Sequence, residues 1–145
     1  MKKILVILSL CLSTVCSLPA QEWLTDIDTA KEISIKEHKP IILVFQGSDW
    51  CAPCMKLERE IWSTEEFKEY AKGTYVLLKA DFPRKRKNLL PADQQAKNNQ
   101  LAEKYNTDGF FPLVVVLDQN GEVLGKTGYE KVAPKAFIEI LNSFL

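Results

Sequence analysis

The chain has 145 residues, a length that suits one domain able to bury its own hydrophobic core. It carries 19 lysine and arginine residues against 19 aspartate and glutamate residues. This balance gives no electrostatic reason to expect a nucleic acid or an anionic membrane as a partner. We therefore expect a single domain that binds no nucleic acid and is a monomer.

The first 20 residues have the pattern of an export signal. Lys2 and Lys3 form a short basic region, residues 4–12 are almost all apolar, and residues 17–20 end in the small residue Ala20. The apolar stretch over residues 4–18 contains serines and a threonine and is shorter than the roughly 20 residues of a membrane-spanning helix. The pattern predicts a cleaved signal peptide over residues 1–20, a mature domain over residues 21–145 and a periplasmic location.

Two of the four cysteines, Cys11 and Cys16, lie in the segment that we expect to be removed. Cys51 and Cys54 are then the cysteines of the mature protein, which excludes a scaffold built on several disulfides. An alternative is that Cys16 becomes a lipid-modified N-terminus. Val15 is larger than the small residue that usually precedes such a cysteine, so cleavage after Ala20 is the favoured interpretation.

The first half of the mature chain predicts an alternation of helices and strands. A helix is expected over residues 29–37, followed by a buried strand over residues 41–45, which are all apolar. A turn at residues 47–49 leads to a helix from Cys51 to about residue 61. Ser63 and Glu66 have the spacing of a capping box and predict the start of another helix.

The second half continues with a strand over residues 75–80, a polar stretch over residues 83–88 and a helix over residues 92–105. The apolar residues 113–117 predict a buried strand. Asn120 and Gly121 predict a hairpin turn into a partner strand over residues 122–126, and a last helix is expected over residues 134–144. This order predicts an α/β fold with a mixed sheet and helices on both faces.

The chemistry is expected at Cys51 and Cys54. A cysteine in the first turn of a helix lies near unpaired N–H groups and the positive end of the helix dipole, which favour the reactive thiolate. The spacing allows both sulfur atoms to lie on one face of the turn, and Pro53 is tolerated at an early helical position. We predict that Cys51 is the nucleophile and Cys54 the buried resolving thiol.

Other uses of two cysteines are less well supported. A structural zinc site would lack ligands, because His38 is the sole histidine. Covalent haem attachment needs a histidine after the second cysteine, where this chain has Met55. A disulfide that closes so short a loop stabilises a fold little. We therefore expect a redox pair and neither a metal nor a bound cofactor.

Two motifs together carry a resemblance to a known family. Residues 50–54 (Trp-Cys-Ala-Pro-Cys) lie between a predicted strand and helix, and residues 110–112 (Phe-Phe-Pro) precede a strand and an Asn-Gly hairpin. From about residue 30 to the C-terminus the chain resembles the thioredoxin superfamily. The resemblance implies the thioredoxin fold, a cis peptide bond before Pro112 and pairing of the Phe111 backbone with an extended substrate segment. It also implies that Trp50 shields the disulfide.

Gly128, after the hairpin, matches a glycine that keeps the substrate groove open in this superfamily. It could equally be a loop residue that needs unusual backbone dihedrals. Both interpretations stay open at this point.

The chain departs from thioredoxins at the position that supplies a proton acceptor. An aspartate six residues before the first cysteine lies beneath the disulfide in that family, and here this position is Phe45. Glu58 is the substitute that we predict, because it lies four residues after Cys54 on the same helical face. The same spacing is found in the C-terminal periplasmic domain of DsbD-type proteins, to which this segment is similar.

We predict an exported thiol-disulfide oxidoreductase that reduces or exchanges disulfides of client proteins. Ala52 and Pro53 lack the histidine of strongly oxidising relatives, which favours a reducing couple. Electrons would come from an upstream protein donor, for which a membrane reductant is the natural candidate. The alternatives are a thiol reductant for cytochrome c maturation and a redox-inert binding or chaperone module of the same fold.

The basic run at residues 84–87, from Arg84 to Lys87, is longer than in a minimal thioredoxin. It is either a solvated loop face or a docking patch for an acidic redox partner.

Overall fold

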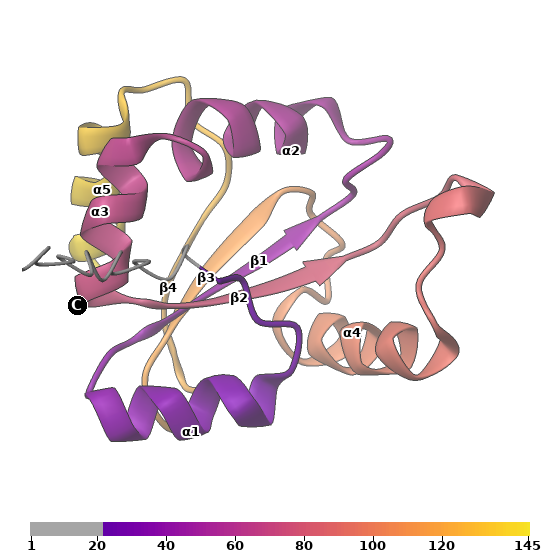
Figure 1. Cartoon of the computed structure of the whole chain (residues 1–145), viewed down its shortest axis with the longest axis horizontal. Coiled ribbons are helices and arrows are strands. Elements are labelled where there is room, and N and C mark those ends of the chain that lie inside the picture. The colour runs from indigo at the N-terminus through magenta and orange to yellow at the C-terminus, as the bar shows by residue number, and fades with distance from the viewer. Residues whose placement is uncertain (1–21) are drawn as a thin grey trace, which may run out of the picture.

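The computed structural model describes residues 22–145 (Figure 1). The expected signal peptide, its cleavage site at Ala20 and the alternative lipid anchor at Cys16 lie outside the described residues. Within residues 22–145 no helix is long and apolar enough to cross a membrane. In chain order the elements are α1 (Ile27–Glu37), β1 (Ile41–Gln46), α2 (Ala52–Leu57), the π-helical turn η1 (Glu58–Trp62), α3 (Glu65–Thr74), β2 (Val76–Asp81), the 3-10 turn η2 (Arg86–Asn88), α4 (Ala92–Tyr105), β3 (Leu113–Leu117), β4 (Val123–Thr127) and α5 (Pro134–Asn142).

The four strands form one mixed sheet in the order β2-β1-β3-β4. β1 pairs with β2 in parallel and with β3 antiparallel, so that Leu43 lies opposite both Leu78 and Val115. β4 returns antiparallel along β3. The predicted mixed sheet is therefore confirmed, with β1 and β3 at its centre.

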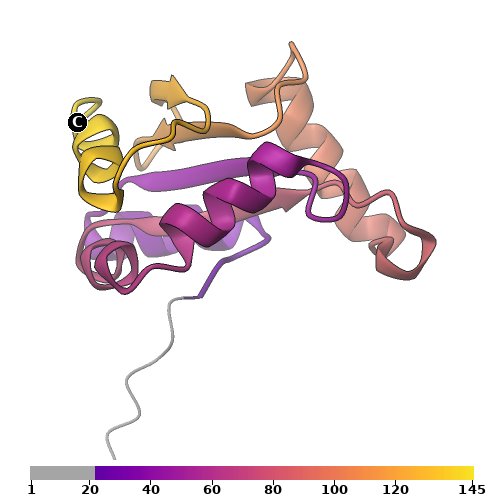
Figure 2. The ribbon, with the colours of Figure 1, turned by 90° about the horizontal axis from the view of Figure 1, so that it is seen from above.

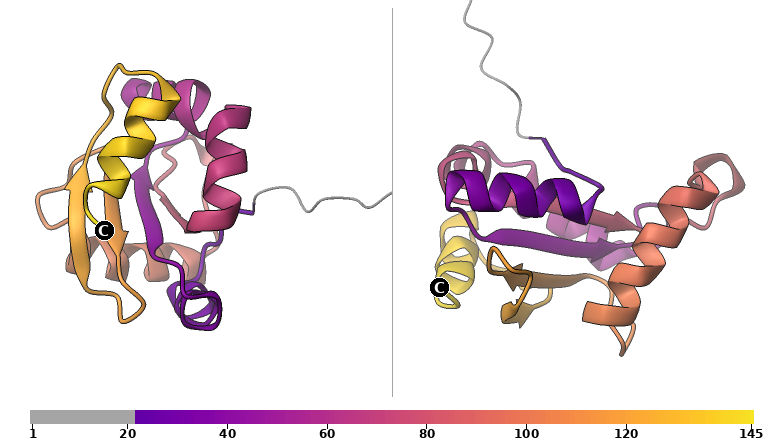
Figure 3. Two further views of the ribbon diagram at one scale, coloured as in Figure 1. Left: turned by 90° about the vertical axis from the view of Figure 1, so that its left-hand side faces the viewer. Right: turned by 90° about the horizontal axis from the view of Figure 1, so that it is seen from below.

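Helices cover both faces of this sheet, as the end-on view in Figure 3 shows. Successive side chains of a strand point to opposite faces. Ile42 and Val44 of β1 pack with residues of α2, η1, α3 and α5, whereas Leu43 and Phe45 pack with residues of α1 and α4. Residues 41–45 have no exposed surface, and burial of each such side chain contributes about 1.5–3 kcal/mol, which explains their continuous apolar run.

The helix that follows Cys51 differs from its prediction at its end. It passes into a π-helical turn in which the Ser63 N–H donates to the Glu58 carbonyl oxygen, 2.8 Å away. This wider turn delays the next helix start by one residue. Thr64, not Ser63, is the N-cap of α3, and its hydroxyl accepts a hydrogen bond from the Phe67 N–H. The predicted capping box of Ser63 and Glu66 is therefore wrong.

Chain direction brings three loops to one end of the sheet. The parallel strands β1 and β2 both end there, and the antiparallel strand β3 begins there. The loop of residues 47–51, the segment of residues 82–91 and the loop of residues 106–112 therefore lie close together (Figures 1 and 2). Cys51 and Pro112, which are far apart in the sequence, belong to this end of the molecule.

Candidate active site

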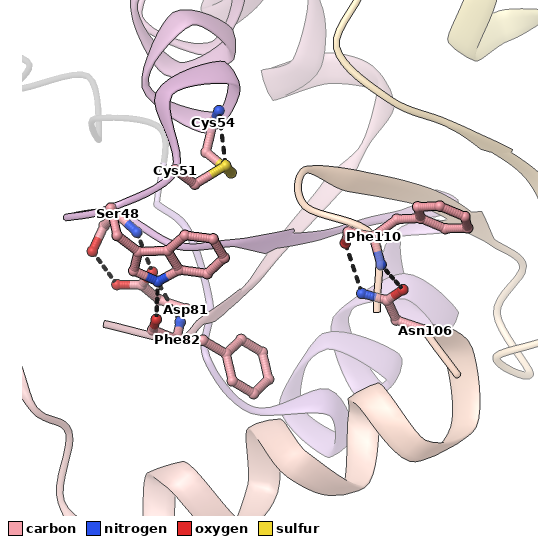
Figure 4. The surroundings of a disulfide bond; sticks show 8 residues. Ser48, Cys51, Cys54, Asp81, Phe82, Asn106 and Phe110 are labelled. Carbon is pink, nitrogen blue, oxygen red and sulfur yellow. Dashed lines mark hydrogen bonds between the residues drawn. A yellow bond between two sulfur atoms is a disulfide. The ribbon is translucent and has the colours of Figure 1, made fainter. Parts of the chain in front are cut away.

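Cys51 and Cys54 form a disulfide with a Cα to Cα distance of 5.2 Å. Cys51 is the N-cap of α2, and its Sγ accepts a hydrogen bond from the Cys54 N–H over 3.2 Å (Figure 4). An N–H group that points at sulfur, together with the helix dipole, stabilises negative charge on Cys51 once the bond is reduced. Cys51 and Cys54 are 4% and 3% exposed, so exposure does not show which of them is the nucleophile. The capping position of Cys51 distinguishes them.

The peptide bond between Phe111 and Pro112 is cis, as the sequence resemblance implied. The preceding loop is held by Asn106, whose amide donates to the Phe110 carbonyl oxygen and accepts from the Phe110 N–H, each over 2.9 Å (Figure 4). Asn106 is buried, while Phe110 is 60% exposed. Sequence reasoning missed Asn106, and its position directly after α4 was the available signal.

A groove of about 340 Å³ lies beside this loop and has both Pro112 and Gly128 in its wall. Gly128 does not have a positive φ, so the interpretation that it needs unusual dihedrals is wrong. A Cβ atom at this position would lie 3.6 Å from the Pro112 carbonyl oxygen. The structure therefore brings together two of the residues expected in the substrate groove.

Trp50 is fixed from several sides. Its indole N–H donates to the Phe82 carbonyl oxygen over 2.7 Å, and its ring centre lies 5.4 Å from that of Phe111. A Cβ atom on Gly47 would lie 2.2 Å from the indole, so only glycine leaves room for the ring there. Phe111 thus turns its side chain toward Trp50. Gly47 and Phe82 were not predicted from the sequence.

Two carboxylates tie the loop before Cys51 to the segment after β2. Asp81 accepts hydrogen bonds from the N–H and the hydroxyl of Ser48, at 2.9 and 2.6 Å (Figure 4). Asp49 accepts from the N–H groups of Arg84 and Lys85 and from the Asn88 amide, each at 2.9 Å. The Arg84 N–H is the main cause of a lowered pKa at Asp49. These bonds hold the loop that precedes Cys51 in a fixed position.

A second cleft, of about 290 Å³, opens on the other cysteine. Cys54, Glu58 and Gln46 are among the residues that line it. One oxygen of the Glu58 carboxylate accepts a hydrogen bond from the Ser63 hydroxyl at 3.0 Å, and the other lies 3.4 Å from the Lys79 ammonium group. Cys54 and Glu58 therefore lie on the same side of the helix, as predicted.

Phe45 is not beneath the disulfide. It is fully buried in the core on the α1 and α4 face of the sheet, whereas α2 covers the opposite face. The next residue, Gln46, is the last residue of β1, and its side chain lines the cleft beside Cys54. The position beneath the disulfide was expected six residues before Cys51, at Phe45, and this is wrong. Which face a strand residue points to depends on how many residues the turn between it and Cys51 contains.

The described residues 22–145 contain no cluster of three or more histidine, cysteine or acidic side chains able to hold a metal ion. The Cys51–Cys54 disulfide borders the cleft of Glu58 through Cys54, and the groove of Pro112 and Gly128 is formed by other loops.

Comparison with known proteins decides the family. The family model of the thioredoxin-like domain matches residues 27–145. The chain belongs to the thioredoxin-like family. This thioredoxin-like chain is 38% identical over 116 residues to the disulfide bond reductase DsbH of Chlamydia pneumoniae, a match that covers 80% of the chain and 68% of DsbH. It is 27% identical over 110 residues to the thioredoxin-related protein DsbJ of the same organism, covering 74% of the chain but 31% of DsbJ.

Solved structures agree. A DsbH oxidoreductase structure superimposes with a TM-score of 0.80 at 35% identity and covers 88% of the chain and 85% of its own length. The oxidised C-terminal domain of DsbD from Neisseria meningitidis shares the fold, with a TM-score of 0.56 at 22% identity over 86% of the chain and 100% of that domain. With its Cys51–Cys54 pair in this fold and its homology to DsbH, the thioredoxin-like chain is a thiol-disulfide oxidoreductase.

Proposed function

We propose that the chain reduces or exchanges disulfides of client proteins outside the cytoplasm, with Cys51 as the attacking sulfur. One observation carries the assignment of roles: Cys51 Sγ caps α2 and accepts the Cys54 N–H. This environment favours a thiolate at Cys51. DsbH, with 38% identity, is named a disulfide bond reductase, which supports the reducing direction.

The reaction consists of two sulfur exchanges. The Cys51 thiolate attacks a client disulfide, forms a mixed disulfide and displaces one client sulfur as a thiolate. Cys54 then loses its proton and attacks Cys51 Sγ, which releases the second client thiolate. The client gains two electrons and takes up two protons, while the chain is left with the Cys51–Cys54 disulfide. A reduced dithiol protein upstream returns the pair to the dithiol form.

Glu58 accepts the proton that Cys54 loses. Both residues line the same cleft, and Lys79 and Ser63 hold the Glu58 carboxylate there. The Glu58 side chain is 43% exposed, so water can also serve as proton acceptor. Glu58 therefore accelerates this step without being indispensable.

A client segment binds in extended form beside the cis bond. The backbone of Phe111 offers hydrogen-bonding groups to such a segment, which is the strand-addition mode of recognition. Pro112 and Gly128 form part of the groove wall along its path, and Trp50, which packs against Phe111, shields the disulfide as the family resemblance implies.

The place of action follows from the signal peptide predicted over residues 1–20. We infer a periplasmic protein that acts as a monomer, with lipid attachment at Cys16 as the alternative. An exported protein does not draw electrons from cytosolic reductases, so a membrane-bound protein is the proposed donor.

Trapping of clients tests this function. A Cys54→Ala variant lacks the resolving thiol and should accumulate mixed disulfides with its clients on non-reducing gels. Cys51→Ala is the matched control and should accumulate none. Clients identified by mass spectrometry would distinguish general reduction from cytochrome c maturation. If Cys54→Ala traps nothing and the wild type does not reduce insulin, the chain is a binding module and the proposal is wrong.

A further inference from the structure

Four consecutive cationic residues lie beside the active site. We call residues 84–87 the basic segment; it consists of Arg84, Lys85, Arg86 and Lys87. All four residues are exposed, and within residues 22–145 none of them belongs to an ion pair shorter than 4 Å. The whole chain has as many acidic as basic residues, so this concentration of positive charge is local. The segment projects at the end of the sheet that holds the disulfide (Figures 1 and 2).

The backbone of the basic segment is held in place. Asp49, two residues before Cys51, binds the N–H groups of Arg84 and Lys85 and the Asn88 amide. The anchoring fixes the backbone that carries the charges relative to Cys51 before any partner arrives, which lowers the entropic cost of binding.

Arg84 connects the basic segment to the path of the client. Its guanidinium carbon lies 3.7 Å from the centre of the Trp50 ring, and Phe111 is another neighbour of that ring. Phe111 precedes Pro112 at the groove. Side-chain contacts thus connect Phe111, the neighbour of Pro112, through Trp50 to Arg84. A client segment that pairs with Phe111 and presents its sulfur to Cys51 reaches the basic segment within a few residues.

We infer that the basic segment binds acidic residues that flank the target cysteine of a client, and so selects clients by charge. This inference rests on the proposed reductase function. Arg84 is occupied with Trp50, which leaves Lys85, Arg86 and Lys87 to pair with carboxylates. Two acidic groups at this end of the sheet are already engaged, Asp81 with Ser48 and Asp49 with backbone N–H groups. Charge pairs at such an exposed rim affect selectivity and association rate more than they affect tight binding.

A pair of peptides tests the inference. Both contain one intramolecular disulfide and differ at three positions beside one cysteine, which carry glutamate in one peptide and glutamine in the other. We expect the reduced protein to reduce the acidic peptide with a kcat/KM about tenfold higher, because exposed ion pairs are individually weak but add. The preference should disappear at about 0.5 M salt, where charges are screened over a few ångströms.

Variants locate the preference on the chain. The triple variant Lys85→Gln, Arg86→Gln, Lys87→Gln leaves the contact between Arg84 and Trp50 in place and should reduce the ratio of the two kcat/KM values to near one. The matched control removes the same charge elsewhere through glutamine at the exposed Lys36, Lys72 and Lys135, and it should keep the wild-type ratio. A wild-type ratio near one, or a ratio that the first triple variant retains, would overturn the inference.

A binding measurement separates this inference from the reductase function. Labelled peptides with serine in place of cysteine undergo no sulfur exchange, and fluorescence anisotropy gives their affinities directly. Tighter binding of the acidic peptide, lost in the Lys85, Arg86 and Lys87 variant, supports the basic segment even if neither disulfide peptide is reduced. Reduction of both peptides without any difference in affinity or rate supports the reductase and overturns the charge selection.

Discussion

The ammonium group of Lys79 on β2 lies 3.4 Å from the carboxylate of Glu58, at the start of the π-helical turn. The pair links the sheet to the helix that carries Cys54. We propose that Glu58 replaces, from a helix, the carboxylate that thioredoxins place on a strand. The cleft that Glu58 and Cys54 share is open to solvent, so proton transfer there has a route to bulk water.

Glu58→Gln tests the role of this carboxylate. We expect reduction of a client disulfide to slow by about tenfold near neutral pH, less than for a fully enclosed base, because water can replace it. The difference should narrow above about pH 9, since a thiol with an ordinary pKa of about 8.5 ionises there unaided. Stopped-flow rates across pH provide the measurement. Glu69→Gln on α3 is the control, and equal profiles for the wild type and Glu58→Gln would exclude Glu58 as the proton acceptor.

Gly47→Ala should displace Trp50. The added Cβ would lie 2.2 Å from the indole, so the ring must leave its bond to the Phe82 carbonyl oxygen. Such overpacking costs about 1–3 kcal/mol in the free energy of unfolding, and a misplaced Trp50 should lower kcat/KM for clients about tenfold. Urea unfolding and tryptophan fluorescence report the two effects.

The matched control is Gly73→Ala in α3, where a Cβ meets nothing within 4 Å. A helical alanine in open space should stabilise the chain by about 0.5–1 kcal/mol and leave the rate unchanged. If Gly47→Ala behaves like Gly73→Ala, the packing of Trp50 is not needed for activity.

Asp26 makes the stability of the chain depend on pH. It caps α1 by accepting the Thr29 N–H, and the hydrogen bond from Lys97 is the main cause that lowers its pKa to about 2. A lowered folded-state pKa means that this stabilisation is fully present above about pH 4 and is lost as pH falls toward 2. Asp26→Ala should therefore cost about 1 kcal/mol at pH 7 and progressively less below pH 4.

Urea unfolding of the Asp26→Ala variant at several pH values measures this dependence. Glu32→Ala, at an exposed position inside the same helix, is the control and should change stability by no more than about 0.5 kcal/mol at any of these pH values. A constant difference between the wild type and Asp26→Ala down to pH 2 would contradict the assignment.

Local patterns explain why much of the fold was predictable. Three elements are each predicted by a pattern of only a few residues. They are the apolar run of β1, the cysteine motif before α2 and the turn at Gly121, which has a φ of 83°. Chain direction then places the disulfide and Pro112 at one end of the sheet. The local motif identified Cys51, whereas the cis bond before Pro112 was expected from the resemblance to the thioredoxin superfamily.

Some of the contacts that were missed join residues far apart in the sequence. Asp49 binds the backbone of Arg84 across 35 positions, and no local pattern contains that pairing. Phe45 was placed wrongly for a related reason, since one residue more or less in a turn exchanges the two faces of a strand. Ser63 failed as a helix cap because the π-helical turn adds a residue that propensity does not reveal.

Asn106 shapes the substrate groove through two hydrogen bonds to the backbone of Phe110. Asn106→Leu keeps a similar volume but leaves the Phe110 N–H and carbonyl without these partners, which should cost about 1–3 kcal/mol of stability. The loop before Pro112 would lose its fixed position, so KM for a protein client should rise several-fold, about 1 kcal/mol in binding. A small aromatic disulfide, which reaches Cys51 without using the groove, should react at a rate much closer to that of the wild type.

Steady-state kinetics with insulin and with the small disulfide separate the two effects. Asn99→Leu is the control, because Asn99 is exposed on α4. Within residues 22–145 its amide oxygen accepts a hydrogen bond only from Gln95. If Asn106→Leu remains folded and its KM for insulin equals that of the wild type, the loop does not contribute to client binding. A parallel loss with both substrates would instead mean that Asn106 supports the disulfide itself, because only damage at Cys51 slows a reagent that bypasses the groove.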